Sequence, residues 1–556
     1  MMNRLPALVL SLAVVSLAAI GSSISGESSG APSSSMLAAA SVSPAAPGPE
    51  LGRIRFPNSG APEAQPAFIR GVLLLHSFEY EDAGEAFREA QRLDPDFAMA
   101  YWGEAMTFNH PLWRQQERDA AIEALGRYAA DPAARAAKTV DERERGFLHA
   151  VETLYGEGDK VERDLAYSEA MGRLSERFPD DLEARAFHAL SILGTAQGVR
   201  DFAVYMRAGA VAEEVFAANE LHPGAAHYLI HSYDDPVHAP LGLRAARVYA
   251  QIAPAASHAQ HMISHIYVAL GHWSESVDAN VKSFDVSAER RQRKELGIDA
   301  LNYHSLHWLE YSYLQLGRFD DARAQLEMMT RYAKESLSPR ALWYHAAMRA
   351  AYMVETGAAD APAEIDTAGT HVTGAAADLF AGGYAALRAG DRRRAVALAD
   401  RMGTRYDSAA SGHLCGQSGG FEDTTKRDLV VAEVMQKSLR ALIALDDGET
   451  DAALTLLEEA TALEGAMSLD FGPPVIVKPS HELYGEVLLE LGRPEDARAR
   501  FRQALARAPR RSLSLAGLAR ASKAIGDAAA ASRACDAIAA NYATADTTVR
   551  ESIRCN

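Results

Sequence analysis

The chain lacks the residue patterns that mark several common classes of enzyme. No HExxH helix, phosphate-binding loop or dinucleotide fingerprint occurs in its 556 residues, which argues against zincins, ATPases and dehydrogenases and predicts no nucleotide cofactor. The only cysteines, Cys415, Cys535 and Cys555, are too far apart for a zinc knuckle or a CxxC redox pair. Export would permit a disulfide between Cys535 and Cys555, but the sequence does not decide whether it forms.

Basic segments and long apolar runs are also scarce. The formal net charge is −18 and no stretch is rich in lysine or arginine, whereas nucleic-acid backbones require basic patches, so no nucleic-acid partner is expected. After the N-terminus, no segment is long and apolar enough to cross a membrane. Valine and isoleucine do not alternate with polar residues, and alanine dominates the apolar residues, so helices are favoured over strands.

The N-terminus has the outline of a secretory signal. Arg4 precedes an apolar run from Leu5 to Ile20, and small residues follow at positions suited to cleavage. The run is short for a membrane span, which leaves an uncleaved anchor as the alternative. We expect a signal peptide over residues 1–21, a disordered linker rich in Ser, Gly, Ala and Pro over residues 22–66, and a mature protein that is periplasmic or secreted.

The same repeat occurs near both ends of the remaining chain. Gly71 is followed after 12, 16, 19 and 24 residues by alanine, phenylalanine, alanine and proline, and Gly485 is followed by the same residues at the same offsets. These spacings match the 34-residue tetratricopeptide pattern, in which small residues let two antiparallel helices approach and proline begins the next unit. The chain therefore resembles the tetratricopeptide repeat (TPR) family. The resemblance implies an all-α solenoid of antiparallel helix pairs with a concave groove.

Weaker copies of the repeat lie between these two. Leu-Gly pairs that end at Gly271 and Gly317 mark helix turns, and counting back from them puts the small-residue position of the first helix at Ser264 and Glu310. Ile230 lies one repeat before Ser264. The interval between Ser264 and Glu310 is 46 residues, so this unit carries about twelve extra residues relative to the 34-residue repeat.

The repeats divide the mature chain into three regions. We expect helices from about residue 66 to residue 540, with breaks near residues 358–373 and 407–420, where glycine, serine or proline accumulate. The regions are an N-terminal solenoid over residues 67–356, a helical or loop connection over residues 357–425, and C-terminal TPR repeats over residues 426–550.

Histidines gather on one face of the N-terminal solenoid. By the resemblance, groove-lining residues lie six and three positions before the small-residue position of a first helix, and one, four and five positions after it, which is one stripe of an α-helix. Three consecutive units fill these positions with His227, His231, Asp234 and Asp235, then His258, His261 and His265, then His304 and His307. Flanking units add the groove-lining candidates His76, Trp102, Asn109 and His110.

This stripe predicts a transition-metal site. Histidines at i and i+4 project from one helix face closely enough to share a metal, and a neighbouring helix supplies more ligands. The expected ligands are His227, His231, His261 and His265. Further ligands, outer-sphere groups or proton-transfer groups are His258, His304, His307 and Asp234, and this many histidines leaves room either for two metals or for such groups beside one. Imidazole suits Zn, Cu or Fe, and an added aspartate favours Zn or non-haem Fe.

Two functions remain open at this point. In the first, the protein is a metal-dependent enzyme or a metal-handling protein, and both hydrolysis and oxidation fit a histidine-rich open site. In the second, it is a metal-free TPR scaffold whose groove holds a partner helix, a peptide or a small molecule, and the histidines supply hydrogen bonds and pH sensitivity. His222, which precedes Pro223, is either a helix cap or a ligand.

Overall fold

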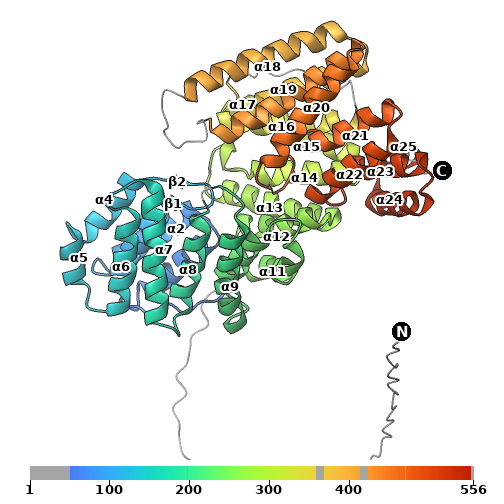
Figure 1. Cartoon of the computed structure of the whole chain (residues 1–556). Coiled ribbons are helices and arrows are strands. Elements are labelled where there is room, and N and C mark those ends of the chain that lie inside the picture. Colours follow the sequence, from blue (N-terminus) through green and yellow to red (C-terminus); the bar gives the residue numbers. More distant parts are fainter. Residues whose placement is uncertain (1–50, 197, 358–368, 414–423, 470, 553–556) are drawn as a thin grey trace, which may run out of the picture. The chain divides into compact units, whose positions relative to one another are not determined.

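Antiparallel helix pairs make up almost the whole of the described chain (Figure 1). The computed structural model describes residues 51–196, 198–357, 369–413, 424–469 and 471–552, which belong to one unit beginning at Pro49. Consecutive helices are joined by short turns and pack against each other, so the fold is the all-α TPR-like solenoid that the repeat predicts. The expected signal peptide lies outside the described residues.

The N-terminal helices are interrupted by one small hairpin where the sequence predicted helix. The chain begins with α1 (Gln65–His76), α2 (Tyr80–Leu93) and α3 (Ala98–Met106). The hairpin then pairs β1 (Asn109–His110) with β2 (Gln115–Gln116). The helices that follow are α4 (Arg118–Tyr128), α5 (Pro132–Lys138), α6 (Glu142–Leu154), α7 (Lys160–Arg177), α8 (Leu182–Gly194) and α9 (Phe202–Ala218).

The middle of the chain contains the histidine-rich units. Their helices are α10 (Pro223–Tyr233), α11 (Ala239–Ile252), α12 (Ser257–Leu270), α13 (Trp273–Arg293), α14 (Tyr303–Gln315), α15 (Phe319–Ser336) and α16 (Pro339–Thr356). The extra residues before α14 lengthen α13 and form a short 3₁₀ helix, η1 (Ile298–Ala300). Each of α10, α12 and α14 is the first helix of a pair, as the repeat register predicts.

Helix pairs continue through the region that was expected to be a connection. The helices are α17 (Val372–Arg388), α18 (Arg392–His413), α19 (Lys426–Asp446), α20 (Thr450–Ala466), α21 (Ser480–Glu490), α22 (Pro494–Arg507), α23 (Ser512–Ala524), α24 (Ala528–Asn541), η2 (Tyr542–Thr544) and α25 (Thr547–Ser552). The break expected from residue 407 is wrong for residues 407–413, which complete α18; residues 414–423 lie outside the described chain. Cys535 on α24 is disulfide-bonded, whereas Cys415 and Cys555 are not described.

In both clear repeats, glycines of the first helices pack closely against a phenylalanine of the second helix. In the C-terminal copy, a Cβ atom added to Gly485 would lie 2.8 Å from the ring of Phe501, and one added to Gly517 would lie 2.1 Å from it. Both distances are too short for a side chain larger than hydrogen, so the glycines let two first helices close on the phenylalanine of the helix between them. The N-terminal copy repeats this arrangement around Phe87.

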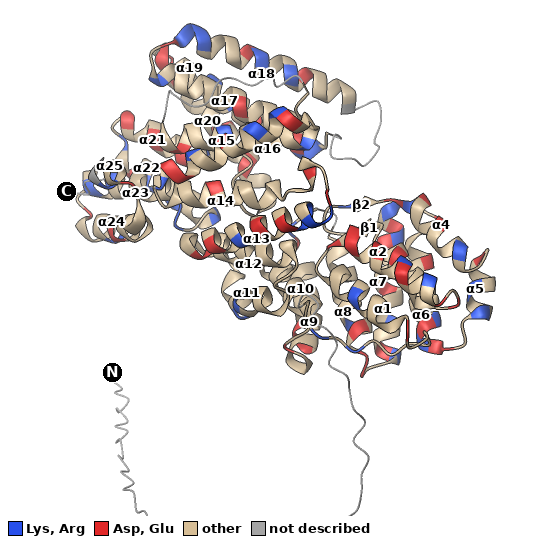
Figure 2. Ribbon diagram, turned by 180° about the vertical axis from the view of Figure 1, so that it is seen from behind, with Lys and Arg blue, Asp and Glu red and all other residues tan. Residues whose placement is uncertain are grey.

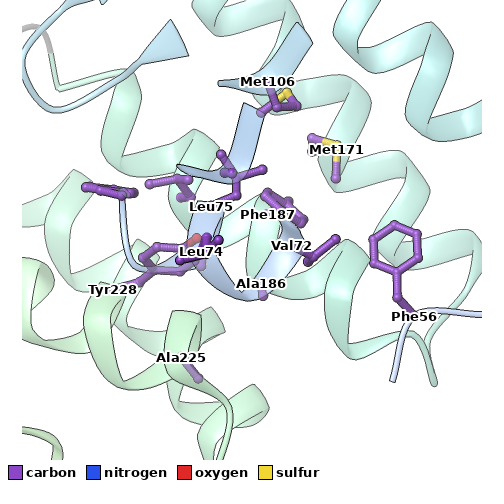
Figure 3. Packing of buried hydrophobic residues seen from close by; sticks show 14 of the residues in the cluster. Phe56, Val72, Leu74, Leu75, Met106, Met171, Ala186, Phe187, Ala225 and Tyr228 are labelled. Atoms are coloured by element: carbon purple, nitrogen blue, oxygen red, sulfur yellow. The ribbon is translucent and has the colours of Figure 1, made fainter. Parts of the chain in front are cut away.

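The last part of the expected linker is folded, which corrects its C-terminal boundary. Leu51 and Phe56 are 6% and 4% exposed, and the ring of Phe56 lies 5.1 Å from that of Phe68 and 5.3 Å from that of Phe147. Phe56 and the neighbouring core side chains are seen in Figure 3. The apolar residues of this segment bury surface against α1 and α6, a gain that a purely polar linker would not offer.

Long-range contacts join segments that are far apart in sequence. The end of α1 reaches α10, where Nδ1 of His76 lies 2.8 Å from the hydroxyl of Tyr228. Near the C-terminus, the backbone amide of Ser512 donates to the side chain of Gln315 at 2.9 Å, joining α23 to α14. The histidine-bearing helices are thus supported from both ends of the unit. Among the described helices, none is both long and apolar enough to cross a membrane.

Candidate metal centre

The histidines of the predicted stripe come from three first helices, α10, α12 and α14. Neither α10 nor α12 contains lysine, arginine, aspartate or glutamate, and both ribbons are tan in Figure 2. On α10 the histidines are spaced by one turn, as are two of the three on α12. The side chains that meet between these helices are therefore mostly imidazoles and apolar groups.

His227, His231 and His258 form a first imidazole group. One ring nitrogen of each lies within 4.8 Å of the others. The Nε2 atom of His227 is 3.0 Å from Nε2 of His231 and 3.2 Å from Nε2 of His258. Nδ1 of His227 donates to the carbonyl oxygen of His76 at 2.7 Å, so Nε2 of the neutral ring carries a lone pair. The Nε2 atoms of His231 and His258 both lie close to this single lone pair.

His261, His265 and His304 form a second imidazole group with the same 4.8 Å limit. The Nε2 atoms of His261 and His265 are 3.0 Å apart, and the ring of His304 lies 4.4 Å from that of His261 between centroids. α12 therefore supplies one ligand candidate to the first group and two to the second. The number of histidines on the stripe left room for two metals, and the side chains indeed separate into two groups, which divide the four expected ligands between them.

In the second group, both outward-facing ring nitrogens are held by oxygen acceptors. Nδ1 of His261 lies 2.7 Å from Oδ1 of Asn280, and the amide orientation is fixed because Nδ2 of Asn280 donates to the carbonyl of Ser276 at 2.8 Å. Nδ1 of His265 lies 2.5 Å from Oδ2 of Asp234. Each Nδ1 therefore carries a proton, so in the neutral form of each ring Nε2 is the bare nitrogen, and the two Nε2 atoms face each other.

Facing lone pairs repel unless a cation lies between them. Two imidazole nitrogens bound to one ion at about 2.0–2.1 Å are about 2.9–3.4 Å apart when the angle at the ion is near square or tetrahedral. The distance of 3.0 Å between Nε2 of His261 and Nε2 of His265 falls in that range. Donation of the opposite ring nitrogen to a carboxylate or carbonyl oxygen is also how metal-bound imidazoles are usually oriented.

Aromatic side chains surround both groups, and burial favours the neutral form of the imidazoles at their centres. The ring of Phe78 lies 4.3 Å from that of His227, and the ring of Trp308 lies 4.3 Å from that of His265. Burial lowers the pKa of His227 to about 3, and burial with neighbouring imidazoles holds the pKa of His261 well below its usual value of 6.5. His227 and His261 are therefore neutral at neutral pH, which is the form of imidazole that binds a metal ion.

Each group has one ring on its open side. His227 and His261 are fully buried, but His258 and His304 are only partly buried. Trp113, which is 49% exposed, lies over His258 with its ring 5.7 Å away. The exposed edges of these rings give a path by which an ion or small ligand could reach each group.

A third cluster, His76, Glu183 and His222, is fully buried but differs chemically from the other two. Nε2 of His76 donates to Glu183 at 2.8 Å while its Nδ1 accepts from Tyr228. Nδ1 of His222 caps α10 by accepting from the amide of Ala225, so its Nε2 carries the proton and lies 3.3 Å from the other Glu183 oxygen. Both rings direct protons at the carboxylate, which leaves no inward lone pair for a metal.

Several residues expected along the groove are placed differently. Trp102 is 0% exposed and packs against Phe147 and Phe187, and His76 is also fully buried, so neither lines a groove. α3 ends at Met106, which puts Asn109 and His110 in the hairpin: Asn109 accepts from Gln116, and His110 stacks on Tyr80. The helical offsets fail here because the first helix of this unit is too short to carry them.

Three other candidates lie beside the two groups without joining them. His307 contacts Trp343 and Tyr344 rather than the imidazoles. Asp234 contacts His265 from outside the second group, and Asp235 pairs with Arg200 and His238. The sequence reading missed Asn280, because it lies on the second helix of its pair, and Phe471, whose ring lies 5.3 Å from His265.

Comparison with known proteins gives no functional assignment. No family model matches the chain, and no curated protein is similar to it. Among solved structures, the APC/C hetero-tetramer Cut9–Hcn1 is 10% identical with a TM-score of 0.33, over 89% of this chain and 77% of that chain. A monomeric IFIT1 mutant with Gppp-AAAA is 12% identical with a TM-score of 0.36, over 84% and 94%. The human IFIT1 dimer with m7Gppp-AAAA is 12% identical with a TM-score of 0.33, over 87% of this chain and 90% of that chain. Similarity this low supports no inference about function.

Proposed function

We propose that the protein binds two transition-metal ions, one in each three-imidazole group. The observation that carries this proposal is the pair of Nε2 atoms of His261 and His265, 3.0 Å apart, with both Nδ1 protons committed to oxygen acceptors. The first group supports it by a similar arrangement around His227. The third cluster is not included, because its ring protons already meet Glu183.

The donor set favours copper or zinc. Each group offers three neutral nitrogens, and Asp234 contacts His265 instead of completing the set, so the two-histidine, one-carboxylate arrangement of non-haem iron is not formed. Three imidazoles are a known zinc donor set, and imidazole also suits copper, which is bound more tightly than zinc by most nitrogen ligands. The expected preference for iron or zinc through a bound aspartate is therefore replaced by a preference for copper, then zinc.

Three protein ligands leave at least one coordination position open. Open positions are typical of catalytic metal sites, whereas structural zinc sites are closed by four protein ligands. The partly buried His258 and His304 place that open side toward the surface of each group. We therefore propose a metal-dependent enzyme or a metal carrier. The signal-like N-terminus supports a location outside the cytoplasm, where such a protein would meet exogenous metal.

The alternative, a metal-free peptide-binding scaffold, is weakened by the chain's own segment around Gly472. A Cβ atom on Gly472 would lie 2.2 Å from the ring of Trp308, and Phe471 packs on His265. Residues of the segment before α21 thus pack against one side of the second imidazole group. A partner helix bound there would have to share this surface with the chain's own segment.

Elemental analysis of the purified full-length protein tests the proposal. After incubation with copper or zinc and removal of free metal, we expect about two ions per chain. A His227→Ala/His261→Ala variant should retain neither, while His307→Ala, which changes a buried histidine outside both groups, should retain both. A wild-type protein that binds no copper or zinc under these conditions would overturn the proposal and favour the scaffold.

A further inference from the structure

A separate cleft lies beside the second imidazole group, and its walls come from distant parts of the chain. The space within the cleft is about 900 Å³ when its open mouth is included. α12 contributes Val268 and Ala269, α22 contributes Ala504, and the segment before α21 contributes Pro474 and Ile476. These side chains make most of the wall apolar.

Three aromatic residues face the same cleft. They are Trp273, Tyr311 and Phe471. The indole nitrogen of Trp273 donates to the carbonyl of Arg510 at 3.3 Å, and the hydroxyl of Tyr311 accepts from Arg511 at 2.8 Å. Because these polar atoms are already paired, the rings offer the cleft mainly apolar surface, against which another aromatic ring can pack.

One oxygen in the wall is buried without a partner. Asp234 is 3% exposed, and its Oδ2 accepts from His265. Its Oδ1 has no hydrogen-bond partner among the described residues, and the residue lines the cleft. A buried carboxylate oxygen without a donor is costly, so a ligand that brings a donor to this point would gain a strong hydrogen bond. Nδ1 of His481 is a second unpartnered atom on the same wall.

We propose that this cleft binds a small aromatic molecule that carries a hydroxyl group, with the hydroxyl donating to Oδ1 of Asp234. A neutral donor fits better than an organic cation for two reasons. Asp235 and Glu464 also line the cleft, but Arg200 pairs with Asp235 and Arg507 lies in the same lining, so positive charge already partly balances these carboxylates. A neutral hydroxyl also avoids the cost of removing an ammonium group from water.

This inference goes beyond metal binding and does not require it. The cleft and the second group share Asp234, which lines the cleft and accepts from His265 through Oδ2. If both proposals hold, a phenolic ligand would lie one side chain away from a bound ion. The cleft proposal stands on the unpartnered oxygen and the apolar walls alone, so it can be tested on metal-free protein.

The test compares three probes of similar size on the full-length protein in chelator, by calorimetry and ligand-observed NMR. They are 4-methylphenol, 4-methylanisole, which has the ring but no donor, and benzylamine, which is cationic. A hydrogen bond to a charged acceptor predicts that the phenol binds about 10- to 100-fold more tightly than the anisole. Equal affinity for phenol and anisole, or tightest binding of benzylamine, would overturn the proposed ligand class.

Two substitutions of alanine by phenylalanine distinguish binding in the cleft from binding elsewhere. Ala508, the residue directly after α22, lines the cleft, whereas Ala506, in the last turn of that helix, is exposed and does not. Ala508→Phe should abolish phenol binding, and Ala506→Phe should leave it unchanged. Both should keep the metal content of the wild type. Unchanged phenol binding by a folded Ala508→Phe variant would place the ligand elsewhere, whatever the outcome of the metal analysis.

Discussion

Nε2 of His261 and Nε2 of His265 face each other at 3.0 Å, one turn apart on α12, while the opposite nitrogens of the two rings donate to Asn280 and Asp234. The acceptors come from α13 and from the end of α10, so each neighbour of α12 fixes one ring. This relationship ties the orientation of the rings to the packing of three helices. Because Asn280 and Asp234 are not themselves ligands, their hydrogen bonds can be removed by substitution without changing a histidine.

Replacing Asn280 should weaken the second site alone. Asn280→Leu keeps the approximate volume but removes the oxygen that holds Nδ1 of His261, and loss of such an outer contact typically costs about 10- to 100-fold in metal affinity. Competition titration with a copper chelator should show this loss for one ion and none for the other. Ser283→Ala, which removes a buried hydrogen bond of the same helix to Ser257, is the control. Equal weakening by both variants would point to a general packing effect.

The two groups should lose their ions independently. Although His258 lies on α12 beside His261, its Nε2 approaches His227 of the first group. A His231→Ala/His258→Ala variant should therefore lose one ion of two, whereas a His258→Ala/His304→Ala variant should lose both. Metal content after gel filtration distinguishes these outcomes. Loss of both ions from the first variant would mean that the six imidazoles act as one site.

The third cluster should contribute to stability and not to metal content. The two histidines around Glu183 hold its pKa down at about 2 despite complete burial, and removing one partner of a buried charged network typically costs about 3–5 kcal/mol. Glu183→Gln should lower the free energy of unfolding by an amount of that order while two ions remain bound. A stable variant that lost a third ion would show that this cluster is a metal site as well.

Periodicity explains why the histidine stripe could be predicted from sequence. The period of 3.6 residues fixes which residues of α10 and α12 share a face, and the repeat fixes which helices are neighbours. The sequence left room for two metals, but it did not indicate which histidines share a group, because this depends on side-chain rotamers: His258 turns toward α10, and His261 toward Asn280. The burial of Trp102 and His76 was missed for another reason. It follows from the packing of the N-terminal pairs against α6, α8 and α10, which the repeat spacing does not encode.

Acidification should destabilise the metal-free protein between pH 6.5 and pH 4. Burial lowers the pKa of His307 and of His345 to about 4, from 6.5. Because the folded pKa is the lower one, the unfolded state takes up protons first. The contribution of these two histidines to stability is therefore retained above pH 6.5, falls with decreasing pH, and levels off below about pH 4. Each of the two contributes about 1.4 kcal/mol per pH unit within this window.

Urea denaturation in chelator at several pH values measures this dependence. His345→Gln should reduce the slope of the free energy of unfolding against pH by the equivalent of about one proton. His149→Gln, at an exposed position, should leave that slope unchanged. An unchanged slope in a folded His345→Gln variant would contradict the assignment of the buried neutral imidazole.

Glycine at the helix crossing should be essential for the C-terminal repeats. A Cβ atom at residue 517 would lie 2.1 Å from the Phe501 ring, so Gly517→Ala must displace a fully buried side chain and should cost about 1–3 kcal/mol. Gly465→Ala is the matched control, because residue 465 also lies in a helix, α20, but a Cβ atom there meets nothing within 4 Å. Its higher helix propensity should stabilise the protein by about 0.5–1 kcal/mol. Opposite signs of the two changes in thermal unfolding would confirm that the Phe501 contact, and not helix propensity, selects glycine at this position; a stabilised Gly517→Ala variant would contradict it.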